Sequence, residues 1–216
     1  MALDRRTELS ENLAEIKATI PQGVHLIVVT KTFPVSDVQI LHELGVTEFG
    51  ENRDQEGKVK APLVPAKWHF QGQLQSNKLR SICEWADVIQ TIDSLRYVDL
   101  LVKTAQKPIE VFIQVSIDDA GVSDKRGGAS PTEINKIADQ ILESHNLRLK
   151  GLMAVAPIEE EPQSAFSRLS HIHQRFKSQF PDAPYLSAGM SGDYLIAIEH
   201  GATHVRLGSS ILGSRD

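Results

Sequence analysis

The stretch Ser187-Ala-Gly-Met-Ser-Gly-Asp193, followed shortly by Thr203-His-Val-Arg-Leu-Gly-Ser-Ser210, indicates the fold of this chain. In each case a short apolar run ends in a turn of Gly and Ser. Glycines let the backbone approach a ligand closely, and turns that open helices direct several N–H groups at one point, which favours a phosphate. Two such turns late in an alternating β/α chain match the phosphate site of a (β/α)8 barrel. Two ordinary surface loops are the alternative.

The rest of the chain alternates apolar, β-branched runs with amphipathic segments. The runs that we expect to be strands are residues 24–30, 46–49, 67–71, 87–91, 109–116, 149–155, 185–186 and 205–207. Eight strands with helices between them imply a parallel sheet. We therefore expect one domain over residues 1–216, an α/β protein of the single (β/α)8 TIM-type barrel class. An extra N-terminal helix presents Leu9, Leu13, Ile16 and Ile20 on one face.

The composition is that of a soluble globular protein. Of 216 residues, 41% are hydrophobic and 24% are charged, and the net charge of −5 argues against a nucleic-acid partner. Cys83 is the only cysteine, which excludes an intramolecular disulfide and a cysteine-based metal cluster. We expect it to be a buried small hydrophobe. With no apolar run long enough to span a membrane and no signal-peptide core, we expect no membrane partner and a cytoplasmic location.

Three polar residues stand at or near strand ends, where such barrels keep their chemistry. Lys31 ends the first strand, and its amine could form a Schiff base with a carbonyl; a solvated strand-end lysine is the alternative. Asn52 at the second strand exit could cap a helix or bind a ligand. His69 lies within the third strand, where a packed histidine is the simpler interpretation. The polar loop at residues 118–130 could be a lid or plain surface.

Several motifs in the chain carry a family resemblance. In order, they are Val29-Thr-Lys-Thr-Phe-Pro34, Phe49-Gly-Glu-Asn52, Trp68-His-Phe-Gln-Gly-Gln-Leu-Gln-Ser-Asn-Lys78, Gly151-Leu-Met153, Leu186-Ser-Ala-Gly-Met-Ser-Gly-Asp193 and Val205-Arg-Leu-Gly-Ser209. Together they resemble the pyridoxal phosphate homeostasis protein family over essentially the whole chain. Members are fold-type III relatives of alanine racemase that keep its barrel and lack its second domain.

The resemblance implies a cofactor site for pyridoxal 5′-phosphate (PLP). Lys31 matches the lysine that holds PLP as an internal aldimine, and Arg206 matches the arginine that faces the pyridine nitrogen. Asn52 and His69 match positions that line the ring side of the pocket. The residues that match the phosphate cradle are Met190, Ser191, Gly208 and Ser209. The departures from the family pattern are Phe33, Arg53, Gln71, Gln73 and Ser209, and none of them removes the lysine or the phosphate site.

The implied function is PLP homeostasis, in which the protein holds the coenzyme as a lysine aldimine without appreciable turnover. The resemblance therefore implies no catalytic residue. PLP-dependent apo-enzymes are the implied recipients, and we expect a monomer. An arginine has donors only, so Arg206 would leave the ring nitrogen unprotonated and a poorer electron sink. A small PLP-dependent amino-acid racemase and a Schiff-base aldolase or other phosphate-binding barrel remain as alternatives. A racemase needs a second acid/base, for which no tyrosine has an evident placement.

Overall fold

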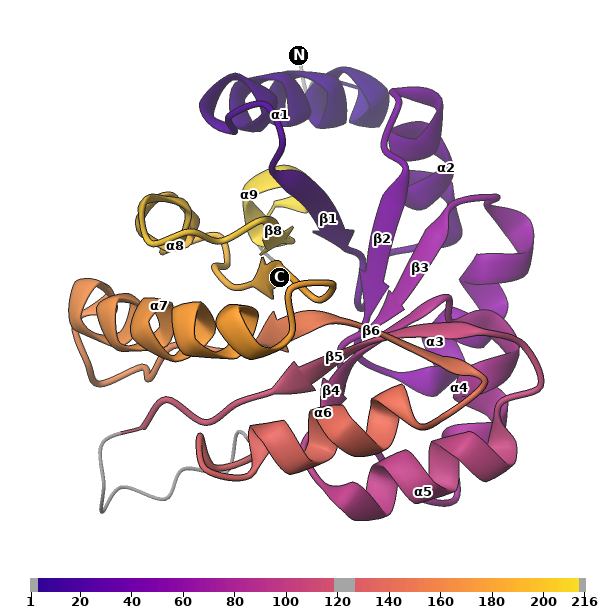
Figure 1. The fold of residues 1–216 in the computed structure, drawn as a ribbon. Coiled ribbons are helices and arrows are strands. Elements are labelled where there is room, and N and C mark those ends of the chain that lie inside the picture. Colours follow the sequence, from indigo (N-terminus) through magenta and orange to yellow (C-terminus); the bar gives the residue numbers. More distant parts are fainter. Residues whose placement is uncertain (1–3, 119–126, 214–216) are drawn as a thin grey trace.

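Eight parallel strands form a closed barrel in the computed structural model, which describes residues 4–118 and 127–213 (Figure 1). Neighbouring strands in the sequence are neighbours in the barrel, and β8 pairs with β1 to close it. The strands are β1 (His25–Val29), β2 (Glu48–Glu51), β3 (Lys67–Phe70), β4 (Val88–Ile92), β5 (Ile109–Gln114), β6 (Leu147–Met153), β7 (Tyr185–Ser187) and β8 (His204–Leu207). The expected TIM-type barrel is confirmed, with strand bounds that differ by a few residues.

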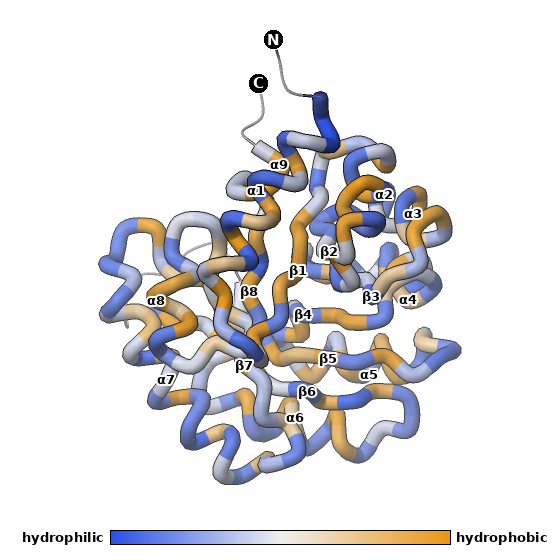
Figure 2. The backbone as a smooth tube through the Cα atoms, turned by 90° about the horizontal axis from the view of Figure 1, so that it is seen from above, coloured by the Kyte–Doolittle hydropathy of each residue, from blue (hydrophilic) through white to orange (hydrophobic). Residues whose placement is uncertain are grey.

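Helices surround the barrel and connect its strands (Figure 1). Those described are α1 (Arg5–Thr19), α2 (Val35–Glu43), α3 (Asp54–Lys60), α4 (Leu79–Trp85), α5 (Leu95–Thr104), α6 (Ile134–Leu142), α7 (Pro162–Gln179), α8 (Tyr194–Glu199) and α9 (Ser209–Leu212), with a short 3-10 turn at Ala61–Leu63. Figure 2 shows β1, β4 and β5 coloured mainly as hydrophobic, with more hydrophilic colour on the surrounding helices. All five residues of β4 are buried, as a strand covered on both faces requires.

The N-terminal helix is bound to the other end of the chain. Its apolar face buries Leu9 and Leu13, as the helical spacing predicts. Asp4 caps the helix by accepting hydrogen bonds from the amides of the first turn. Arg5 donates to Asp37 on α2 at 2.6 Å and to the carbonyl oxygen of Leu212 on α9 at 3.0 Å. The hydrogen bond from Arg5 therefore holds α9, the last described helix, against α1.

The expectations about Cys83 and membrane helices can be compared with the structure. Cys83 is free and buried on α4, and burial raises the pKa of its thiol to about 11. It is a core residue, as expected. Among the described residues, no helix has the length and apolar character needed to cross a membrane.

Candidate functional site

A cavity of about 420 Å³ opens at the C-terminal mouth of the barrel. The residues that follow each parallel strand lie at this end. The size of the cavity falls in the range of small-molecule sites. The described residues that line it are Val29, Lys31, Phe33, Asn52, Gln71, Met153, Val155, Met190, Ser191, Gly192, Arg206, Gly208, Ser209 and Gly213. It therefore brings together seven of the eight residues that the sequence assigned to the cofactor; His69 is the exception.

Lys31 stands in a constrained turn just beyond β1. Its side chain is exposed and forms part of the cavity wall. The next residue, Thr32, has a φ of 68°, a conformation that costs a residue other than glycine free energy. Its amide donates to Glu56 at 2.5 Å, and Lys60 donates to the carbonyl oxygen of Thr30 at 2.8 Å. The backbone on both sides of Lys31 is therefore held in place.

The two Gly/Ser turns predicted from the sequence meet at the cavity and are joined to each other. The hydroxyl of Ser191 lies 3.1 Å from that of Ser210 and accepts a hydrogen bond from the Ser210 amide at 3.3 Å. The backbone amides of Ser191, Gly192 and Ser209 donate to no group within the described residues. These amides, together with the hydroxyls, form a donor-rich wall that suits an anionic phosphate.

Gly189 explains how the first turn fits between the strand and α8. It has a φ of 93°, and a Cβ there would lie 2.8 Å from Tyr194 Cα. Both the left-handed conformation and the close approach exclude a side chain. The glycine that the sequence places before Met190 and Ser191 therefore shapes the turn rather than contacting the cavity.

Arg206 lies in the barrel interior and reaches the cavity from below. Its guanidinium donates from Nη1 to the Ser187 hydroxyl and from Nη2 to the carbonyl oxygen of Ala154, both at 2.9 Å. Burial lowers the pKa of Arg206 to about 10, and the charge of Asp193 opposes that shift. Arg206 is therefore still a cation at neutral pH and presents only donors to the cavity.

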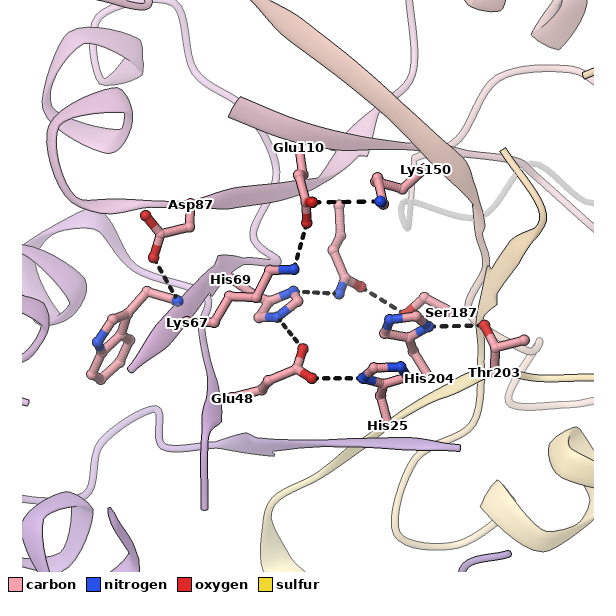
Figure 3. Close-up of polar contacts among 12 residues, drawn as sticks. His25, Glu48, Lys67, His69, Asp87, Glu110, Lys150, Ser187, Thr203 and His204 are labelled. Atoms are coloured by element: carbon pink, nitrogen blue, oxygen red, sulfur yellow. Dashed lines mark hydrogen bonds and ion pairs between the residues drawn. The ribbon is translucent and has the colours of Figure 1, made fainter. Parts of the chain in front are cut away.

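A chain of hydrogen bonds runs from Arg206 through the barrel to its N-terminal mouth. Figure 3 shows the part of this chain between Ser187 and Glu48. Ser187 donates to Gln90 Oε1 at 2.8 Å, because its oxygen already accepts from Arg206. Gln90 Nε2 donates to His69 Nδ1 at 2.9 Å, so His69 carries its proton on Nε2 and donates it to Glu48 at 3.0 Å. We call these five residues the barrel relay.

The ends of the barrel relay are charged and its centre is neutral. Burial by itself raises the pKa of Glu48, but hydrogen bonds from His69 and His25 hold it at about 2. Burial lowers the pKa of His69, and Glu48 opposes that shift. A buried arginine and a half-buried carboxylate are thus linked by three neutral side chains.

His69 and Asn52 differ from each other in how the structure places them. His69 is 1% exposed and is absent from the described lining of the cavity. Its connection to the cavity is the hydrogen-bond chain through Gln90 and Ser187 to Arg206. Asn52 lines the cavity, and the N-cap of α3 is Arg53, which makes no side-chain cap hydrogen bond. The capping alternative for Asn52 is therefore wrong.

Gln71 is a site residue that sequence reasoning missed, because it was noted only as a departure from the family pattern. It lines the cavity, and its buried Nε2 has no hydrogen-bond partner among the described residues. A Cβ on Gly50 would lie 2.6 Å from this atom, so the glycine makes room for the amide. A buried donor without a partner costs free energy, which a ligand acceptor in the cavity would recover.

Comparison with known proteins shows which family has this site. The family model of the alanine racemase N-terminal domain matches residues 5–216. Pyridoxal phosphate homeostasis proteins from Mycobacterium bovis and Corynebacterium glutamicum are 35% and 38% identical to the chain. These matches cover 98% and 94% of this chain, and 95% and 98% of those proteins. The chain belongs to the pyridoxal phosphate homeostasis protein family.

A solved structure agrees with this chain in fold over nearly its whole length. PipY of Synechococcus elongatus PCC7942, solved with PLP bound, superposes with a TM-score of 0.85 at 29% identity. The match covers 95% of this chain and 100% of PipY. Most of the polar loop at residues 118–130, which the sequence analysis treated as a lid or surface, lies outside the described residues.

The residues of the cavity fit the chemistry of PLP. Lys31 offers an amine that would meet the aldehyde, the joined turns offer donors that would face the phosphate, and Arg206 offers a donor that would face the ring nitrogen. Gln71 adds an unpartnered donor between these groups in the same cavity. The donor set therefore matches an anionic, acceptor-rich ligand that carries an aldehyde.

Proposed function

We propose that this protein binds PLP at the C-terminal mouth of its barrel and serves in PLP homeostasis. The observation that carries the proposal is the cavity in which Lys31, Arg206 and the two Gly/Ser turns meet. Lys31 holds the cofactor covalently through its amine. The turns of Met190–Ser191 and Gly208–Ser209 bind its phosphate, and Asn52 lines the ring side.

We further propose that the bound cofactor is stored and passed on rather than used for turnover. Besides Lys31, the described lining residues include no carboxylate, histidine, cysteine or tyrosine. A racemase that uses two bases needs such a second group beside its substrate. Arg206 also supports storage over turnover. Because an arginine can only donate, the pyridine nitrogen opposite it stays unprotonated, and an unprotonated ring is a poor electron sink.

The tyrosines give no support to the racemase alternative. Tyr97 donates its hydroxyl to the carbonyl oxygen of Leu74, and the Tyr194 hydroxyl lies 2.8 Å from that of Thr19. Tyr185 begins β7 and packs near the N-terminal mouth, away from the cavity. All three side chains are engaged at other places in the fold.

The recipients that we propose are apo forms of PLP-dependent enzymes, which would take the cofactor from a monomer of this protein. The exposure of Lys31 supports this role, because a transferable cofactor needs an accessible covalent bond. Incubation of the PLP-loaded protein with an apo-enzyme as its only coenzyme source would restore that enzyme's activity. Sedimentation of the loaded protein measures its oligomeric state.

The decisive experiment is a PLP titration followed by borohydride reduction. We expect a visible imine band, and peptide mapping is expected to place the reduced adduct on Lys31. Lys31→Ala removes the band, whereas the control Lys78→Ala keeps it. An unchanged band in Lys31→Ala would reject the assignment.

Two further measurements test the rest of the proposal. Pyridoxal is expected to bind much more weakly than PLP, because the joined turns bind the phosphate. Equal affinities for the two compounds would contradict the assignment of the turns to the phosphate. A panel of L-amino acids tests turnover. Formation of D-amino acids or keto acids at about 1 s⁻¹ or faster would favour the racemase alternative.

A further inference from the structure

Three side chains that can bind a metal meet at the N-terminal mouth of the barrel, on the side opposite the PLP cavity (Figure 3). His25, Glu48 and His204 begin three neighbouring strands, β1, β2 and β8. One ligand atom from each lies within 4.8 Å of the other two. We propose that this cluster, the mouth triad, is a binding site for a divalent transition metal of the zinc class.

His204 is oriented through one ring nitrogen. Thr203 Oγ1 lies 2.8 Å from His204 Nδ1 and 3.1 Å from the carbonyl oxygen of Leu186. In the tautomer that donates from Nδ1 to Thr203, Nε2 keeps its lone pair for a metal. A hydrogen bond to one ring nitrogen commonly orients a histidine whose other nitrogen binds a metal.

Glu48 is anchored through one oxygen and offers the other. His69, oriented by Gln90, donates to Oε2 at 3.0 Å. Oε1 points to His25 Nδ1 at 2.7 Å. A carboxylate fixed in this way can exchange the proton that faces Oε1 for a metal without losing its support from the barrel interior.

His25 is the ligand that must move. Its ring stacks on that of His204 with centroids 4.4 Å apart and planes within 6°. Lone pairs in parallel rings do not converge on one point, so metal binding requires the ring of His25 to turn. Its side chain is 46% exposed, which permits this rotation. The metal replaces the Nδ1 proton, which moves to Nε2, and the ring remains neutral.

The charge and the ligand types favour a zinc-class ion. Two imidazoles and one carboxylate suit zinc and its neighbours better than calcium or magnesium, and three protein ligands leave a fourth position for water. The nearby cations Lys67 and Lys150 both pair with Glu110, at 2.5 and 3.4 Å. Glu48 therefore supplies the local negative charge for the ion.

The test uses the full chain without a histidine tag, titrated with Zn²⁺ by calorimetry and with Co²⁺ by absorption spectroscopy. We expect one ion per chain and the visible bands of tetrahedral Co²⁺. His25→Ala and Glu48→Gln are each expected to weaken binding by at least about tenfold. The control His145→Ala removes an exposed histidine elsewhere and leaves binding unchanged.

A thermal readout keeps the proposal testable if a variant is less stable. Saturating Zn²⁺ raises the melting temperature of the unmodified protein, and this shift disappears in His25→Ala, whose half-exposed side chain contributes little to the core. Absence of binding up to about 100 μM Zn²⁺ would overturn the proposal, as would binding that persists in both His25→Ala and Glu48→Gln. Loss of PLP binding in Lys31→Ala has no bearing on this result.

Discussion

Arg206 Nη1 and Ser187 Oγ are 2.9 Å apart in the buried centre of the barrel. This contact decides the direction of the whole barrel relay, because an arginine can only donate and the serine must then donate to Gln90. The guanidinium that we assign to the ring nitrogen of PLP is thereby oriented by residues on β4 and β7. Its other anchor is the carbonyl oxygen of Ala154.

The first prediction concerns Gln90, the centre of the barrel relay. Gln90→Leu leaves the Ser187 hydroxyl proton without an acceptor and His69 Nδ1 without a donor, and we expect the free energy of unfolding to fall by about 2–4 kcal/mol. Since Arg206 loses its indirect support, the affinity for PLP falls as well and the absorption band of the bound cofactor shifts. The control Gln106→Leu alters an exposed glutamine. An unchanged band in Gln90→Leu would show that Arg206 needs no support from the relay.

The second prediction concerns the unpartnered donor of Gln71. We expect Gln71→Leu to weaken PLP binding roughly 5- to 20-fold, the effect of one lost hydrogen bond. The stability of the protein without PLP should stay constant or rise, because the variant removes a buried donor that has no partner. Fluorescence titration and urea denaturation measure the two quantities. The exposed control variant Gln75→Leu should change neither, and a loss of stability in Gln71→Leu would contradict this account.

The third prediction concerns the ion cluster beneath Lys31. Lys60 donates to Glu51 at 2.6 Å and to Glu56 at 3.0 Å, and both Lys60 and Glu51 are buried. Lys60→Met leaves a buried carboxylate without its cation and is expected to destabilise the protein by about 3–5 kcal/mol. Burial already raises the pKa of Glu51, so the double variant with Glu51→Gln should recover part of the loss. Lys58→Met is the exposed control.

A separate kinetic result is expected from the same variants. Lys60 holds the carbonyl oxygen of Thr30, next to Lys31, so its loss loosens the turn that presents the amine. Stopped-flow absorption should show slower formation of the PLP imine in the double variant. The same rate in the double variant and the unmodified protein would limit the cluster to a role in stability.

The fourth prediction concerns the thiol of Cys83. Burial raises its pKa to about 11, from an ordinary value of 9.0, so the folded state favours the protonated form. This contribution to stability is complete below pH 9 and is lost as the pH rises through 11. The difference between these two pKa values corresponds to about 2–3 kcal/mol. The fall in stability between pH 9 and pH 11 should be smaller by that amount in Cys83→Ala, and a thiol reagent should react with the native protein only slowly at pH 8.

The sequence predicted the barrel and most of the cavity because these depend on local order along the chain. Parallel strands place the residues that follow them at one mouth, so Lys31, Asn52 and the two Gly/Ser turns could be assigned together from their positions. Gln71 was missed because its importance lies in an unpaired atom, and pairing depends on neighbours from other strands.

The sequence by itself determined the alternation of strands and helices, the family and the residues that follow each strand. Only the tertiary structure decided where side chains within the strands point and which residues they contact. His69 shows the difference: the motif places it beside the cofactor, whereas barrel closure turns it toward Gln90 and Glu48. The mouth triad is a stronger case, since His25 and His204 lie 179 positions apart in the sequence and become neighbours only when β8 pairs with β1. The physical reason is that closure of the barrel fixes the register between its first and last strands, and no local pattern encodes that register.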